Sequence, residues 1–150
     1  MGTVTYPDDR VAEFVNSRMV PVQLLYDAQP FATTYNIKWT PTMIVLDSDG
    51  KEHHRIVGFL PPDEFIPGLL LGIAKTAFDR DELVEAMTDL DKIVSTYPKS
   101  AAAPEAMYLR GVVRFKSTHE PEPLKEAFER LKRDYPASEW AKRAMPYSLL

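Results

Sequence analysis

The sequence predicts an α/β part with a small mixed sheet, followed by an all-α part made of helical repeats. Short apolar runs suited to buried strands occur before residue 60, and two of them flank a turn typical of a hairpin. Beyond Phe78 the periodicity is helical throughout and repeats itself. We therefore expect a first domain over residues 1–68 and a second over residues 69–150.

The first elements are predicted to be a helix and a strand. Pro7 prevents an earlier helical turn, and Asp8 or Asp9 can cap the helix. The helix then carries one apolar stripe, formed by Val11, Phe14, Val15 and Met19. The run Val20–Tyr26 is apolar on both faces, which predicts a buried strand. Residues 27–35 form a connection with one helical turn.

A hairpin and a long helix are predicted next. Thr42–Leu46 is a second buried strand, and the turn after it contains Gly50, which is free to take a positive φ. Residues 53–58 return as the antiparallel partner. A helix opened by Pro61 and Pro62 follows, and Pro67 inside it predicts a kink or a fresh helix start.

The C-terminal half contains an internal repeat. Tyr97-Pro98-Lys99-Ser100 returns 38 residues later as Tyr135-Pro136-Ala137-Ser138. The same shift superposes Leu90 on Phe128, Ile93 on Leu131, Ala103 on Ala141 and Ala106 on Ala144. Each unit is predicted to be a helix that stops at Tyr-Pro, a serine N-cap and an alanine-containing helix. Such self-similarity is typical of stacked helical pairs.

Composition excludes several classes of function. The chain has no cysteine, so it can supply no disulfide, cysteine nucleophile, cysteine-bound zinc or thiol redox couple. Its net charge of -4 argues against nucleic acid as the partner. No apolar run approaches the roughly 18 residues of a membrane span. The first residues do not form a secretory signal, so we expect a cytoplasmic protein, or a periplasmic one if the natural start lies upstream of Met1.

The segment Tyr35–Thr42, the strand after it, the Asp-x-x-Gly hairpin and Gly58 resemble the C-terminal half of thioredoxin-like proteins. The resemblance covers roughly residues 8–75 and implies a cis Thr40–Pro41 bond. It also implies a Cys-x-x-Cys half and a central strand, both of which the sequence lacks. Residues 69–147 resemble tetratricopeptide repeats. Together the two parts resemble bacterial thioredoxin-domain proteins with a helical-repeat extension.

The absent central strand leaves Val20–Tyr26 without the partner that the resemblance implies. Buried backbone groups without partners cost on the order of 1–3 kcal/mol each. Two arrangements could supply partners. Val20–Tyr26 could pair directly with Thr42–Leu46 through a right-handed crossover, or two chains could pair their edges in a homodimer. We favour the homodimer slightly.

The candidate binding site is Trp39, Thr40, Pro41 and Thr42. In relatives the residue before the cis proline offers its backbone to an extended peptide; alternatively, Pro41 serves fold geometry alone. His53 and His54 should point to opposite faces of a strand, so we predict no metal site there. Asp47–Gly50 is better explained as a hairpin turn than as a calcium loop. The aromatic residues of the second half could line a peptide groove or pack helices together: Tyr97, Tyr108, Tyr135, Trp140 and Tyr147.

Two clusters of charge are expected to be solvated helix faces. The acidic one is Asp79, Asp81, Glu82 and Glu85, and the basic one is Lys132, Arg133, Lys142 and Arg143. No cofactor is predicted. The leading functional hypothesis is a non-catalytic, redox-inactive module that binds a protein or an extended peptide. The alternatives are the C-terminal portion of a thiol–disulfide oxidoreductase whose Cys-x-x-Cys lies upstream of Met1, and a structural oligomer without a ligand.

Overall fold

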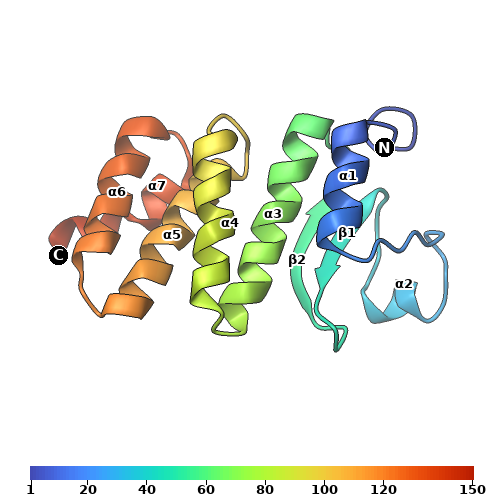
Figure 1. Ribbon diagram of the computed structural model, residues 1–150, viewed down its shortest axis with the longest axis horizontal. Coiled ribbons are helices and arrows are strands. Elements are labelled where there is room, and N and C mark those ends of the chain that lie inside the picture. Colours follow the sequence, from blue (N-terminus) through green and yellow to red (C-terminus); the bar gives the residue numbers. More distant parts are fainter.

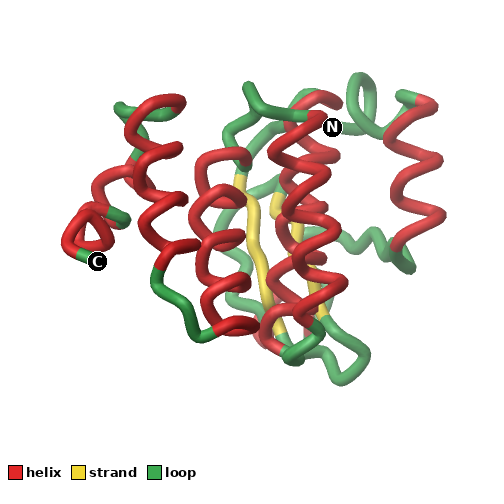
Figure 2. The backbone as a smooth tube through the Cα atoms, turned by 60° about the vertical axis from the view of Figure 1, so that its left-hand side comes forward, coloured by secondary structure: helices red, strands yellow, loops and turns green.

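A computed structural model describes all 150 residues. Along the chain the elements are α1 (Asp9–Arg18), α2 (Phe31–Thr34), β1 (Thr42–Leu46), β2 (Glu52–Val57), α3 (Pro62–Asp79), α4 (Leu83–Thr96), α5 (Ala103–Thr118), α6 (Glu122–Asp134), α7 (Glu139–Arg143) and the 3-10 helix η1 (Met145–Leu149). Figures 1 and 2 show α3 lying along the β hairpin, with the later helices continuing away from it. The predicted fold class, an α/β part followed by helical repeats, is confirmed.

The helix α1 begins and packs as predicted. The carboxylate of Asp8 accepts a hydrogen bond from the backbone N–H of Arg10 at 2.9 Å, which caps the helix. Val11 and Phe14 are buried in the main core, where α1 packs against α3. This packing holds the first helix against the centre of the molecule.

The predicted hairpin is also present. β1 and β2 pair antiparallel, with Thr42 opposite Val57 and Val45 opposite His54. In the turn, Gly50 adopts a φ of 79°, a conformation that favours glycine. One face of the hairpin lies on α3 so closely that a Cβ added to Gly72 would stand 2.6 Å from Cγ2 of Val45. The hairpin is thus fixed to the helix that joins both parts.

The predicted buried strand at Val20–Tyr26 is wrong. The segment has no strand partner, its residues are exposed, and Val20 is 89% exposed. Its one backbone hydrogen bond is a turn contact, from the N–H of Ala28 to the carbonyl of Leu25 at 3.0 Å. Direct pairing with β1 is therefore wrong as well. The sheet consists of the hairpin alone, so it is antiparallel rather than mixed. A strand needs a second segment to satisfy its backbone, and none is present.

The helix α3 connects the two parts without interruption. It runs from Pro62 to Asp79 with Pro67 inside it, so the fresh start predicted at Pro67 does not occur. It contacts both strands of the hairpin, α1 and α4. Leu70 is completely buried at its middle. The domain boundary that we predicted after residue 68 falls inside this shared helix.

The internal repeat is visible in the backbone. α4 and α6 both stop at the Tyr-Pro pair, where the N–H groups of Tyr97 and Tyr135 bond back to the carbonyls of Ile93 and Leu131. Ser138 caps α7 as predicted, because its hydroxyl accepts from the N–H of Ala141 at 3.1 Å. The same prediction for Ser100 is wrong. Its hydroxyl donates to the carbonyl of Tyr97 at 2.8 Å instead, and α5 begins after Ala102.

One buried ion pair joins the first helix to the repeats. Asp89 on α4 is 4% exposed, and Arg18 at the end of α1 donates to both of its carboxylate oxygens at 2.9 and 2.8 Å. The two residues are 71 positions apart in the sequence. The pair therefore fixes the N-terminal part relative to the first repeat. None of the helices has the length and apolar character needed to cross a membrane.

Candidate functional site

The four predicted binding residues lie together where the chain enters β1. The Thr40–Pro41 peptide bond is cis, as is Gln29–Pro30. Trp39 is 70% exposed, whereas Pro41 and Thr42 are half-buried. The hydroxyl of Thr42 donates to the carbonyl of Trp39 at 2.6 Å, which closes the bend. The indole of Trp39 is thereby presented to solvent next to the first residue of the strand.

The outer edge of β1 has no partner. The N–H of Gly58 donates to the carbonyl of Pro41 at 2.8 Å. This bond determines which residues of β1 direct their backbone groups toward β2. In an antiparallel pair, alternate residues direct their N–H and C=O groups away from the partner. The backbone groups of Thr42 and Ile44 therefore face outward along the free edge. Such an edge is a template for an added strand.

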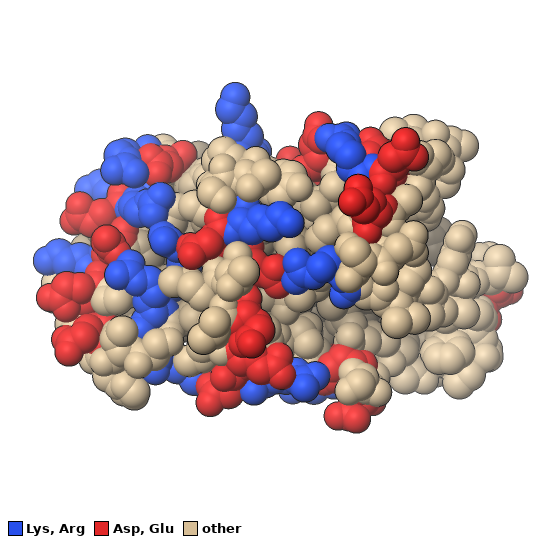
Figure 3. Space-filling model, viewed as in Figure 1, with Lys and Arg blue, Asp and Glu red and all other residues tan.

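The surface at this end of the molecule is apolar and carries little charge. Between Val20 and Leu46 the only charged residues are Asp27 and Lys38. Figure 3 shows Lys, Arg, Asp and Glu spread over the helical repeats, while the end that carries α2 is almost free of them. Large apolar side chains are exposed here: Val20, Val22, Leu24, Leu25, Tyr26, Phe31, Trp39, Val57 and Phe59. An exposed set of this kind marks an interaction surface.

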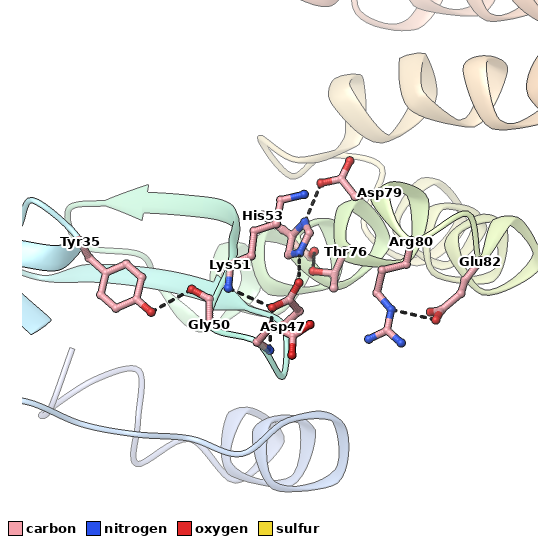
Figure 4. A network of polar contacts seen from close by, with 11 residues as sticks. Tyr35, Asp47, Gly50, Lys51, His53, Thr76, Asp79, Arg80 and Glu82 are labelled. Carbon is pink, nitrogen blue, oxygen red and sulfur yellow. Dashed lines mark hydrogen bonds and ion pairs between the residues drawn. The ribbon is translucent and has the colours of Figure 1, made fainter.

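Two polar contacts hold the loop before β1 in place. Arg55 on β2 donates to the backbone carbonyl of Tyr35 at 2.6 Å and also pairs with Glu52. The hydroxyl of Tyr35 donates to the carbonyl of Gly50 at 2.9 Å (Figure 4). Sequence reasoning missed the role of Arg55, because no local pattern links it to a residue 20 positions away.

A histidine clamped by two carboxylates joins the hairpin to the end of α3 (Figure 4). In His53, Nε2 lies 2.8 Å from Asp47 and Nδ1 lies 2.6 Å from Asp79. The hydrogen bond to Asp47 and the charge of both carboxylates raise the pKa of His53. The same hydrogen bond, with the backbone N–H groups of Lys51 and Asp49, lowers the pKa of Asp47 to about 2. The clamp favours a charged imidazolium between two carboxylates.

The geometry of His53 indicates a structural role. Both ring nitrogens are engaged and the side chain is 1% exposed, so neither nitrogen can reach a substrate. His54, one residue further along the strand, faces Lys75 instead, and burial together with that lysine lowers its pKa to about 4. The two histidines have different partners, but both contact α3, at Asp79 and Lys75, and the register of the hairpin shifts beside them, so the predicted orientation to opposite faces is not evident. No group of three metal-binding side chains lies close enough together to hold an ion.

The aromatic residues of the second half divide into two groups. Tyr108 packs on Trp140 and stacks on Tyr147 with ring centroids 5.1 and 5.7 Å apart, and the two tyrosine hydroxyls lie 2.8 Å apart. Burial and this contact raise the pKa of Tyr147 to about 12. These three pack α5 against α7 and η1 and do not line a groove. The second group is Tyr97 and Tyr135. Tyr97 packs against the main core, and Tyr135 donates its hydroxyl to the carbonyl of Pro98 at 2.6 Å.

The predicted charge clusters are largely neutralised by ion pairs. In the acidic cluster, Asp79 holds His53, Asp81 pairs with Lys116 and Glu82 pairs with Arg80. In the basic cluster, the ion pairs are those of Arg133 with Asp134 and Arg143 with Glu139. The free edge of β1 remains chemically open, together with the exposed residues beside it. It offers unpaired backbone groups and apolar side chains, which suit the binding of an extended chain.

Comparison with protein-family profiles supports both halves of this architecture. Neither a curated protein nor a solved structure shows significant similarity to the chain. Residues 3–70 match the profile of a thioredoxin-like domain family. Residues 61–146 match the profile of the YfiO family, which is described as an outer membrane lipoprotein. The two matches overlap on α3, the helix that both parts share. Because the second match covers more than half of the chain, the protein belongs to the YfiO family, with a thioredoxin-like domain in front of the repeats.

Proposed function

We propose that the protein is a non-catalytic interaction module that takes up an extended strand of a protein partner at the free edge of β1. The observation that carries the proposal is that the outward backbone groups of Thr42 and Ile44 have no partner. The incoming strand would pair with these groups, beginning next to Trp39, Thr40 and Pro41. Main-chain hydrogen bonds would supply affinity, and the exposed apolar side chains would supply contact area.

The first partner that we propose is a second copy of the chain. The segment Val20–Tyr26 has the length and the apolar composition of a strand, so it could serve as the added strand. It contains no charged residue, and in particular none of the lysines that usually block the pairing of exposed edges. Reciprocal exchange of this segment would give a closed twofold dimer. Each copy would then bury the apolar surface that is exposed in the single chain.

Light scattering over a range of protein concentrations tests the dimer. We expect the mass to rise from 17.1 kDa toward twice that value. Leu25→Lys should lower self-association by placing a charge on the donated segment. Thr42→Pro should do the same, because the N–H that it removes points to the free edge and not to β2. Val84→Lys is the matched control, since Val84 is equally exposed but lies on α4. A mass of one chain at every concentration contradicts the dimer.

A second candidate function is the C-terminal portion of a thiol–disulfide oxidoreductase. The observation that favours it is again the unpaired edge of β1, which a central strand encoded upstream of Met1 could occupy. An in-frame Cys-x-x-Cys in the upstream genomic sequence supports this candidate. For the 150 residues themselves we expect no turnover in an insulin-reduction assay, since the chain contains no cysteine. Thiol-dependent turnover by this polypeptide contradicts the non-catalytic proposal.

A further inference from the structure

A cavity lies between the two helical repeats, on a part of the molecule distant in sequence from the free edge. Its volume is about 330 Å³, and it opens where α4 and α6 both end. The residues that line it come from α4, α5, α6 and the loops after α4 and α6: Val94, Pro98, Met107, Arg130, Asp134 and Tyr135. Because both repeats contribute, neither repeat could form this cavity alone.

The apolar wall of the cavity is held in place by one hydrogen bond between the repeats. The hydroxyl of Tyr135 donates to the carbonyl of Pro98 at 2.6 Å, so the Tyr-Pro stop of the second repeat is fastened to that of the first. Burial raises the pKa of Tyr135, which keeps this hydroxyl protonated and able to donate. Val94, Pro98 and Met107 then form a preformed apolar surface beside it. A preformed wall reduces the entropy that a ligand must lose on binding.

The cavity contains one arginine and one carboxylate that do not form an ion pair with each other, although the charge of Arg130 helps to lower the pKa of Asp134. Arg133 donates to both oxygens of Asp134 at 2.7 and 3.0 Å, which neutralises the one carboxylate of the lining. Arg130 is half-buried and has no ion pair and no side-chain hydrogen bond. Its guanidinium therefore remains a cation with open donors, placed next to an apolar wall. The cavity is suited to an anionic group attached to an apolar one.

The neighbouring arginines of α5 differ from Arg130, because each of them has a carboxylate partner. Arg110 and Arg114 line a small depression that adjoins the cavity and shares Met107 and Arg130 with it. Arg110 is paired with Asp91, and Arg114 is paired with Glu126. Both guanidinium groups are thus occupied by carboxylates of the protein. Of these three arginines, Arg130 is the one that makes no direct ion pair with a carboxylate of the protein.

We propose that this cavity binds an extended peptide segment of a protein partner in which an acidic residue stands next to an apolar one. The side-chain carboxylate accepts hydrogen bonds from the guanidinium of Arg130, a geometry that arginine can satisfy with two donors. The apolar side chain packs on Val94, Pro98 and Met107. The volume of about 330 Å³ lies at the lower end of the range for ligand pockets and can hold the two side chains of such a segment. The proposal does not depend on strand pairing at β1, so either can fail without the other.

Fluorescence anisotropy with short labelled peptides tests the proposal on the full chain. The probe is a peptide blocked at both ends that contains glutamate followed by leucine between glycine and serine residues. A second peptide replaces the glutamate with glutamine. A third has no acidic side chain but carries a free C-terminal carboxylate. We expect the glutamate peptide to bind the wild-type protein about tenfold or more tightly than the glutamine peptide, since a charge-assisted hydrogen bond is lost.

Two matched variants show whether Arg130 is responsible. Arg130→Gln should reduce the preference for glutamate to within about twofold, and Arg130→Lys should retain part of it, because a lysine keeps the charge without the paired donors. Arg80→Gln removes the same charge from an exposed arginine between α3 and α4 and should leave the preference intact. Circular dichroism establishes that each variant is folded.

Three results would overturn the proposal. The first is equal binding of the glutamate and glutamine peptides, or no binding of either. The second is a preference for glutamate that Arg130→Gln leaves unchanged. The third is binding of the free-carboxylate peptide alone, which would show that the cavity takes chain ends and not acidic side chains.

Discussion

The two halves of the molecule use similar apolar residues with opposite results. In the helical half, Leu90, Ile93 and Leu131 are completely buried. In the α/β half, the equally apolar segment Val20–Tyr26 lies at the surface. A helix satisfies its backbone internally and needs its neighbours only for side-chain packing. A strand needs a neighbouring strand both for its backbone hydrogen bonds and for side-chain packing. A segment without such a neighbour therefore stays unpaired along its whole length.

The largest expected effect separates a buried from an exposed leucine. Leu90→Ala should lower the free energy of unfolding by about 3 kcal/mol, because it leaves a cavity at the contact of α4 with its neighbours. Leu25→Ala in the α/β half should change it by less than about 0.5 kcal/mol when the protein is dilute. Urea unfolding at low protein concentration measures both. A loss at Leu25 as large as that at Leu90 would mean that Val20–Tyr26 is buried in solution.

The ion pair between α1 and α4 should have the next largest effect. Arg18→Ala removes the partner of a carboxylate that is 4% exposed, and we expect a loss of roughly 2 kcal/mol of unfolding free energy. Adding Asp89→Ala to this variant should recover part of the loss, since the unpaired charge disappears. The control is Arg80→Ala, whose partner Glu82 has an exposed side chain, with no resolvable change expected. An additive double variant would show that the pair does not couple the two halves.

Sequence patterns predicted the helical half well because its determinants are local. The Tyr-Pro stops and the cap at Ser138 follow from residues close together in the chain. The thioredoxin-like hairpin was predicted for the same reason. The failures concern long-range partners: the position of Val20–Tyr26 depends on a neighbour that is not present, and the contact of Arg18 with Asp89 joins residues 71 positions apart.

The cap predicted at Ser100 failed for a different reason. Ser100 and Ser138 occupy equivalent places in the repeat. Ser138 has the extended backbone of an N-cap, with φ -71° and ψ 150°, whereas the hydroxyl of Ser100 donates to the carbonyl of Tyr97. α5 begins further from its serine than α7 does, because Ala102 and not Ser100 precedes its first helical residue. In the candidate site, the four residues at the bend before β1 were predicted, whereas the arginine that holds the loop was not.

A glycine at a helix contact gives a smaller effect that tests the packing of the repeats. A Cβ added at Gly111 would lie 2.6 Å from Cβ of Ala127 and 3.0 Å from the carbonyl oxygen of Pro123, neither of which can move aside easily. Gly111→Ala should therefore lower the unfolding free energy by about 1 kcal/mol, the cost of overpacking exceeding the helix propensity gained.

The control for this substitution lies in α3. A Cβ at Gly68 meets the flexible ends of Ile56 and Leu60, at 3.0 and 3.6 Å, so those side chains can adjust. Gly68→Ala should be close to neutral or slightly stabilising in thermal unfolding. A loss of stability at Gly68 equal to that at Gly111 would show that the two contacts are equally tight, which contradicts the prediction.

A pH dependence of the stability is expected to arise in the α/β half alone. The folded protein raises the pKa of His53 above its ordinary value of 6.5, so it binds the proton more tightly than the unfolded chain does. This contribution to stability is present below about pH 6.5 and is lost as the pH rises through the folded pKa. His54 acts in the opposite direction. Its pKa is lowered to about 4, so its contribution is lost as the pH falls below 6.5.

The two histidines therefore predict a maximum of stability near pH 6.5, with a separate cause for the decline on each side. Urea unfolding between about pH 5 and pH 8.5 should show His53→Gln abolishing the decline above the maximum and His54→Gln abolishing the decline below it. Each variant is the control for the other, and Asp47, whose pKa is about 2, titrates outside this range. A wild-type stability that stays constant from pH 6.5 upward would mean that the clamp on His53 opens in solution. The hairpin would then be held to α3 by its apolar face alone.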